Sequence, residues 1–167
     1  MIVRTLQKHI ESSLFKKKVI ILYGARQVGK TTLVKEIQKK YRDSLYLNCD
    51  EPDIRATLTN PTSTALRSSI GHKRLVFLDE AQRIANIGST LKLMVDTFPE
   101  VQVVATGSSS FELSNKIVEP LTGRAKEFYL YPFSMEELKQ LYSEIELQRI
   151  LEQRMVFGMY PLFQDPL

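Results

Sequence analysis

The chain has 167 residues, with 23 Lys and Arg against 19 Asp and Glu, one Cys and no Trp. This length suits one domain that buries about 70% of its unfolded surface, and a single thiol excludes a disulfide framework and a cysteine-rich zinc module. The net charge of +4 is too small to indicate nucleic acid by itself, and apolar runs such as Val19–Tyr23 reach only five residues. A membrane span needs about 20, so we expect a soluble, cytoplasmic domain without one.

Short apolar segments alternate with helical patterns along the chain. We predict strands at Val19–Tyr23, Leu45–Leu47, Leu75–Leu78, Val101–Ala105 and Glu127–Leu130. Helices are expected after the first strand, within residues 48–69, from an N-cap at Ser89, and over residues 111–117. Strands that alternate with helices predict an α/β fold with a parallel sheet covered on both faces.

Two further helices are predicted at the C-terminal end. Ser134 and Glu137 form a capping-box pattern that opens the first, and Ser143 caps the second. Gly158 ends the second helix. We therefore expect a core over residues 1–133 and a helical appendage over residues 134–167.

The segment Gly24–Thr31 fits the phosphate-loop (Walker A) pattern G-x-x-x-x-G-K-[ST]. Its two glycines permit a tight turn whose backbone N–H groups face phosphate oxygens, and the following helix N-terminus favours an anion. Lys30 would reach the β- and γ-phosphates of ATP, and the Thr31 hydroxyl would bind Mg²⁺. The nucleotide-binding residues predicted here are Gly24, Ala25, Arg26, Gln27, Val28, Gly29, Lys30, Thr31 and Thr32.

Asp79 and Glu80 end a buried strand and have the form of a second nucleotide-binding (Walker B) motif. A carboxylate at the tip of a strand can hold the Mg²⁺ shell, which is the role predicted for Asp79. Glu80 could polarise the water that attacks the γ-phosphate. The alternative is an acidic pair that merely opens the next helix.

The residues after Asp79 separate the classes of nucleotide-binding protein. A GTPase should show D-x-x-G, but Asp79 is followed by Glu-Ala-Gln, and Asn115–Val118 lacks the aspartate of N-K-x-D. Guanine specificity is therefore not expected. The D-E-A-x tetrad of helicases matches Asp79–Gln82, but those enzymes need a second motor domain, for which this chain is too short.

Three more polar residues are candidates for the site. Ser108, at the end of the fourth strand, could contact the γ-phosphate or the attacking water, or belong to an ordinary serine-rich turn. Arg124, before the fifth strand, could stabilise transition-state charge in cis or across a subunit boundary, or be a solvated charge. Arg26 could touch the γ-phosphate, face a partner, or be a mobile tip residue.

The ordered set of motifs resembles the ATPase domain of a prokaryotic AAA-type family, in which that domain precedes a C-terminal domain of unknown function. The resemblance is carried by Leu22–Leu33, Leu47–Asp50, Leu78–Gln82, Thr106–Ser109, Leu121–Arg124 and Tyr131–Ser134. It implies a P-loop NTPase α/β/α sandwich with sheet order 5-1-4-3-2, which would place Ser108 between the two phosphate motifs. It also implies the roles given above to Lys30, Thr31, Asp79 and Glu80, and strengthens the γ-phosphate or trans-acting role of Arg124.

The sequence departs from that family in two places. Gly158–Pro161 stands where the family has a double glycine before Tyr-Pro, and the chain stops at Leu167, where the second domain would begin. We therefore expect a truncated form that lacks the C-terminal domain.

These motifs predict an Mg²⁺-dependent ATPase domain that drives or switches a partner. One alternative is a nucleotide-binding interaction module with negligible turnover; another, suggested only by the pI of about 9.1, is a DNA-associated ATPase. A trans-acting Arg124 would require a homo-oligomer.

Overall fold

The computed structural model describes residues 2–108 and 120–161, with the backbone alone over residues 151–157. The strands are β1 (Val19–Gly24), β2 (Ser44–Asn48), β3 (Leu75–Asp79), β4 (Gln102–Ser108) and β5 (Ala125–Leu130). The α-helices are α1 (Thr5–Glu11), α2 (Lys30–Gln38), α3 (Pro52–Leu58), α4 (Ser63–Ile70), α5 (Ile87–Thr97), α7 (Met135–Leu138) and α8 (Glu144–Phe157); a 3₁₀ turn, η1, spans Ala81–Arg83. The helix expected over residues 111–117 lies outside the described residues.

The five strands form one parallel sheet in the order β2-β3-β4-β1-β5. Viewed from the opposite edge this is 5-1-4-3-2, so the predicted fold class and strand order are confirmed. Since the strands are parallel, their carboxyl ends share one edge of the sheet. There, Gly24 pairs in register with Ser108, and Asn48 pairs with Asp79.

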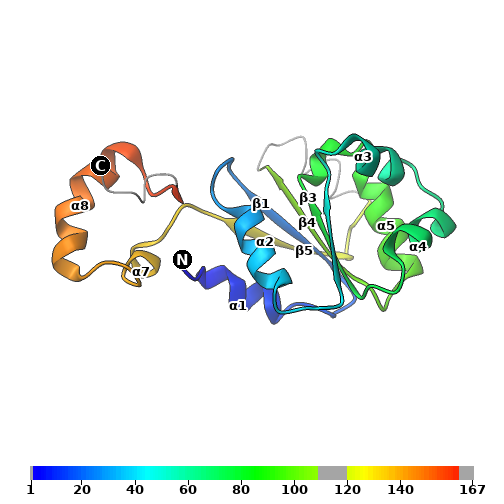
Figure 1. Cartoon of the computed structure of the whole chain (residues 1–167), viewed down its shortest axis with the longest axis horizontal. Coiled ribbons are helices and arrows are strands. Elements are labelled where there is room, and N and C mark those ends of the chain that lie inside the picture. The colour runs from blue at the N-terminus through cyan, green and yellow to red at the C-terminus, as the bar shows by residue number, and fades with distance from the viewer. Residues whose placement is uncertain (1, 109–119, 162–167) are drawn as a thin grey trace.

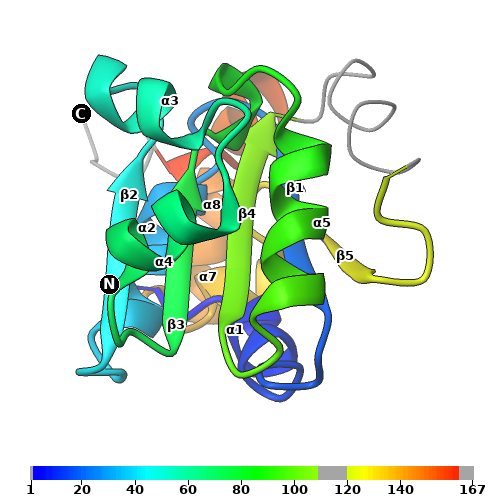
Figure 2. The same cartoon turned by 90° about the vertical axis from the view of Figure 1, so that its right-hand side faces the viewer.

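Helices cover both faces of the sheet and make three layers (Figures 1 and 2). Alternation along β1 divides its side chains between the faces: Ile21 packs on one side and Ile20 on the other. The Ile21 side is closed by apolar residues of α3, α4 and α5, and the Ile20 side by residues of α1 and α2. Burial on both faces explains why β1 and β3 are continuous apolar runs.

The C-terminal helices α7 and α8 gather at the end of the molecule away from α3–α5 (Figure 1). A separate apolar cluster holds them and includes a residue from the beginning of the chain; its buried members are Ile2, Phe133, Leu138 and Leu147. The predicted capping box is present, because Ser134 and Glu137 exchange side-chain and backbone hydrogen bonds. The N-terminal segment therefore packs with the C-terminal helices.

Three local details differ from the sequence prediction. Helix α1 has no counterpart among the predicted elements; it is short and begins without a side-chain N-cap. The N-cap position of α5 is Asn86, whose φ of 55° is left-handed and whose side chain makes no capping hydrogen bond, so Ser89 lies inside the helix. Strand β5 begins at Ala125 because it pairs with β1 from Val19 onward.

No helix within residues 2–108 and 120–161 is long and apolar enough to cross a membrane.

Packing of α5 on the sheet is tested by Leu91, which is fully buried, and the adjacent Lys92, which is exposed. We expect Leu91→Ala to lower the free energy of unfolding by about 2–5 kcal/mol, because it leaves a cavity in the core. Lys92→Ala should stay within about 0.5 kcal/mol of the wild type. Urea denaturation measures both, and equal effects would contradict this packing.

Candidate functional site

The phosphate-loop sequence forms a tight turn between β1 and α2, and both glycines are required by its geometry. A Cβ on Gly24 would lie 2.7 Å from the backbone oxygen of Leu130 and 2.9 Å from Val28 Cγ1, closer than packed atoms approach. Gly29 is the N-cap of α2 with a φ of 97°, a conformation that L side chains rarely adopt. The loop therefore delivers the backbone to the N-terminus of α2, where unpaired N–H groups favour an anion.

Lys30 is folded back onto this loop. Its Nζ donates to the backbone oxygens of Gly24 at 3.0 Å and Ala25 at 2.9 Å, and the residue is 5% exposed. Burial lowers the pKa of the Lys30 ammonium, while the carboxylates of Glu80 and Asp79 oppose that shift. The ammonium is thus bonded to the loop backbone and is stabilised electrostatically by both carboxylates.

Asp79 is the polar centre of the site. Its carboxylate is buried and accepts hydrogen bonds from three hydroxyls: Thr31 at 2.7 Å and Tyr46 at 2.6 Å on Oδ2, and Thr106 on Oδ1. These partners come from α2, β2 and β4, the elements around β3. Burial first, and then the hydrogen bond to Asp79, raise the pKa of the Tyr46 hydroxyl. A buried carboxylate without these donors would be costly, so the three hydroxyls stabilise it.

Glu80 has an unusual backbone and a restrained side chain. Its φ of 55° is left-handed, which is strained for a residue with a side chain, and strain of this kind concentrates at functional sites. Its N–H donates to Thr106 Oγ1 at 3.0 Å, and its carboxylate accepts from Gln82 Nε2. Thr106 thus fixes Asp79 and Glu80 together.

Ser108 and Arg26 lie at the phosphate loop as predicted, whereas Arg124 lies away from it. Ser108 ends β4 beside Gly24, next to the phosphate loop, and Arg26 is exposed within that loop. Arg124 lies at the opposite edge of the sheet: its backbone oxygen accepts from Val19 N–H at the beginning of β1, and its guanidinium pairs with Asp96 at 2.8 Å. The five steps along β1 span roughly 16 Å. A cis contact of Arg124 with a phosphate in the loop therefore has no support in this arrangement.

Two residues that donate to Asp79, Tyr46 and Thr106, were not predicted as site residues from the sequence. Thr106 precedes Ser108 by two positions on the same strand, so it shares a face of the sheet, and that alternation could have found it. Tyr46 carries no such signal, because its meeting with Asp79 depends on β2 lying beside β3.

The donor set fits a hard divalent cation that is shared with phosphate oxygens. Thr31 and Asp79 offer a hydroxyl and a carboxylate oxygen 2.7 Å apart, and oxygen ligands of this kind suit Mg²⁺. The described residues contain no group of three or more His, Cys, Asp or Glu that would cage a metal without a substrate.

Comparison with known proteins identifies the fold family. The model of a family described as "AAA domain" matches residues 16–139, which include the phosphate loop and Asp79–Glu80. The chain belongs to this AAA domain family. It is therefore an AAA-type P-loop NTPase domain, a class that binds nucleotides.

Its relatives in sequence are longer proteins. Two uncharacterized proteins of Methanocaldococcus jannaschii are similar: MJ1544 is 27% identical over 95% of this chain, and MJ1637 is 30% identical over 87%. The matches span 39% and 32% of those proteins, so this chain corresponds to well under half of either.

Solved structures agree on the fold. A Walker-type ATPase of Pyrococcus abyssi superposes with a TM-score of 0.63 at 16% identity, covering 95% of this chain and 64% of that one. The ORC1 protein of Aeropyrum pernix, solved in complex with DNA, superposes with a TM-score of 0.57 at 14% identity, covering 92% and 50%. At these identities the likeness is one of fold.

Cys49 directly follows β2, and its N–H donates to the backbone oxygen of Asp79 at 2.9 Å. The thiol is fully buried, and burial, with Asp79, Asp50 and Glu80 adding to it, raises its pKa to about 12. We expect iodoacetamide to alkylate the folded protein far more slowly than the denatured protein at every pH from about 7 to 9, because only the thiolate reacts and this thiol stays almost wholly protonated there. In denaturant the rate should be higher and should begin to level off near the ordinary thiol pKa of about 8.5, whereas the rate of the folded protein should not level off in this range. Rapid alkylation of the folded protein would contradict this arrangement.

Proposed function

We propose that this domain binds ATP with Mg²⁺ and hydrolyses the bond between the β- and γ-phosphates. The observation that carries the proposal is the hydrogen bond between Thr31 and Asp79 beside the buried ammonium of Lys30. It joins the phosphate loop to the acidic strand end, and each supplies one part of the chemistry. We further propose that the domain acts in the cytoplasm and transmits the reaction to a partner through the region beyond the core, with the core and helical appendage divided near residue 134.

The proposed chemistry assigns a task to each side chain. Lys30 exchanges its hydrogen bonds with loop carbonyls for phosphate oxygens, and Thr31 and Asp79 hold Mg²⁺, which neutralises phosphate charge when bound. Glu80 accepts a proton from the attacking water while the bond from the γ-phosphorus to the bridging oxygen breaks, giving ADP and phosphate. Ser108, beside Gly24 at the loop, contacts the γ-phosphate or that water.

Arg124 enters this proposal only in trans. Its guanidinium is half-exposed and pairs with Asp96 at the amino ends of the strands; in an oligomer it would exchange Asp96 for the γ-phosphate of a neighbouring copy. The proposal therefore includes a homo-oligomer in the active state.

The enzymatic claim is tested by two site variants and a control. We expect Glu80→Gln to lower ATP turnover by roughly 10²–10⁴-fold while ATP still binds, since only proton transfer is lost. Lys30→Ala should lose binding, because the buried cation at the phosphates is removed. Glu136→Gln, at an exposed carboxylate of α7, should match the wild type. Phosphate release and isothermal titration measure these effects.

The outcomes separate this proposal from the interaction-module alternative. Binding that Lys30→Ala abolishes, with no turnover that Glu80→Gln reduces, would favour a nucleotide-binding interaction module. No ATP binding by the wild type would contradict both.

A second candidate function, a DNA-associated ATPase, is favoured by a basic edge of the sheet. At the amino ends of the strands five cations have no ion-pair partner among the described residues: Lys16, Lys17, Lys18, Arg42 and Arg74. Two of them, Arg42 and Arg74, line a cavity of about 600 Å³. Its other lining residues are Phe15, Lys40, Tyr41, Asp43 and Leu75. Cations interleaved with aromatic rings suit the phosphates and bases of a single strand.

The turn that presents Phe15 is held from the core. Phe15 is 45% exposed with a left-handed φ of 60°, and its N–H donates to Oε1 of the buried Gln102 at 2.6 Å. Gln102 Nε2 donates to the backbone oxygen of Lys18 at 2.8 Å. The Gln102 side chain therefore binds the backbone at both ends of the turn from Phe15 to Lys18. The exposed ring is thereby fixed beside the cations.

Binding of a fluorescent single-stranded DNA at low salt tests this candidate. We expect the double variant Arg42→Ala/Arg74→Ala to weaken binding and to flatten its salt dependence, because phosphate contacts release counterions. Lys92→Ala, which removes an exposed cation on α5, should bind like the wild type. No binding, or equal loss in Lys92→Ala, would contradict the candidate.

A further inference from the structure

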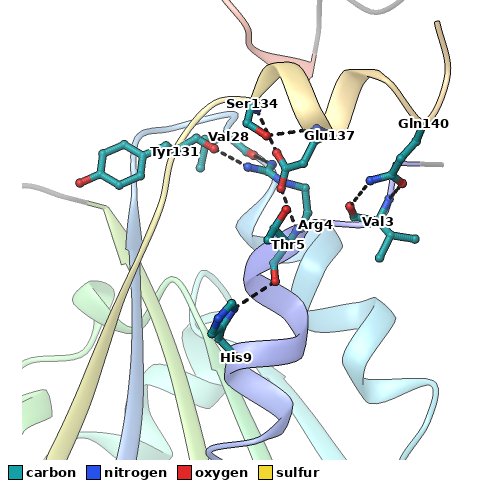
Figure 3. Close-up of polar contacts among 9 residues, drawn as sticks. All are labelled: Val3, Arg4, Thr5, His9, Val28, Tyr131, Ser134, Glu137 and Gln140. Carbon is teal, nitrogen blue, oxygen red and sulfur yellow. Dashed lines mark hydrogen bonds and ion pairs between the residues drawn. The ribbon is translucent and has the colours of Figure 1, made fainter. Parts of the chain in front are cut away.

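Arg4 is a buried cation that joins three separate parts of the chain (Figure 3). Its guanidinium donates from Nη1 to the backbone oxygen of Val28 at 3.0 Å, from Nη2 to the backbone oxygen of Tyr131, and from Nε to Glu137 Oε1 at 3.2 Å. It also lies 4.5 Å from the centroid of the Phe133 ring. The Arg4 and Glu137 side chains are 9% and 6% exposed. Such a planar fork with three acceptors is geometry that Lys cannot reproduce.

The acceptor on Val28 makes this contact relevant to the phosphate loop. In a planar trans peptide, the C=O and the following N–H point in opposite directions. Because Arg4 holds the Val28 oxygen, the N–H of Gly29 is turned away from Arg4. Gly29 caps α2, and a Cβ there would lie 3.8 Å from Arg4 Nη1 and 3.7 Å from Pro161 Cγ. Arg4 thus fixes the peptide plane at the point where the loop becomes a helix.

The other end of the contact is the capping turn of α7. Glu137 Oε1 also accepts from Thr5 N–H at 2.8 Å, and its Oε2 accepts from Ser134 N–H at 3.1 Å. Gln140 exchanges two hydrogen bonds of 2.8 Å with the backbone of Val3. The segment from Val3 to Thr5 is therefore bonded to α7 and its following turn as well as to the phosphate loop. This accounts for the Tyr131–Ser134 motif, which has no part in the chemistry proposed above.

We propose that Arg4 is a positioning residue that couples the phosphate loop to the C-terminal helical segment through Glu137. Movement of α7 displaces Glu137, releases Arg4 from its fixed geometry and frees the Val28–Gly29 peptide, which lowers nucleotide affinity. Nucleotide bound at the loop reciprocally favours the docked position of α7. The coupling rests on the proposed nucleotide binding, and it gives the region beyond the core a route by which to affect that site.

The test compares conservative variants with a packing control in the same segment. Arg4→Lys keeps the charge but cannot reach three acceptors, and Glu137→Gln keeps the shape and an acceptor oxygen. Leu138→Ala disturbs the apolar cluster of Ile2, Phe133 and Leu147 but removes none of the hydrogen-bond acceptors of Arg4. The readouts are the Kd of a methylanthraniloyl-ATP probe, hydrogen exchange of the Gly29 amide, and stability in urea.

We expect Arg4→Lys and Glu137→Gln each to weaken probe binding by about tenfold and to speed exchange at Gly29. The double variant should be no worse than either single variant, because both break one link. Leu138→Ala should lower stability without a comparable loss of affinity.

Wild-type affinity in Arg4→Lys, additive losses in the double variant, or an equal affinity loss in Leu138→Ala would each overturn the proposal. If the wild type binds no nucleotide, the proposed function fails, whereas unchanged Gly29 exchange in Arg4→Lys would show separately that the coupling fails.

Discussion

The site depends on one buried carboxylate. The buried carboxylate of Asp79 is satisfied by three hydroxyls, which donate to it from α2, β2 and β4. The strand order places β2 and β4 on either side of β3. The same contacts bring Thr31 of the phosphate loop to the acidic strand end. The position of Asp79 therefore depends on the strand order. A different order would remove the Tyr46 and Thr106 hydroxyls from its carboxylate and would separate the phosphate loop from the acidic pair.

The phosphate loop and the acidic pair could be predicted from the sequence because their chemistry is local. Gly24 and Gly29 are dictated by close approach and a left-handed turn, and Lys30 and Asp79 follow at fixed positions from buried strands. Tyr46 and Arg4 could not be predicted in this way. Tyr46 meets Asp79 through strand order, and Arg4 meets Glu137 across 133 positions of sequence. Contacts between residues so far apart in the chain produce no periodic pattern in the sequence.

The strand topology shows that Arg124 cannot reach the phosphate loop of its own chain, although its place in a motif allowed that role. A residue that precedes one parallel strand must lie at the opposite edge from a loop that follows another. Arg124 precedes β5 and the phosphate loop follows β1, so the predicted topology already separated them within one chain. Its pairing with Asp96 is consistent with that separation. The same reasoning places the basic edge far from the nucleotide site.

The central claim is that Asp79 and the phosphate loop form one site for ATP and Mg²⁺. Isothermal titration of the wild type and of Asp79→Asn with ATP, in Mg²⁺ and in EDTA, tests it most directly. The account predicts one site per chain whose affinity in the wild type depends on Mg²⁺, and loss of that dependence in Asp79→Asn with residual Mg²⁺-independent binding. Equal Mg²⁺ dependence in both proteins, or no binding by the wild type, would contradict it.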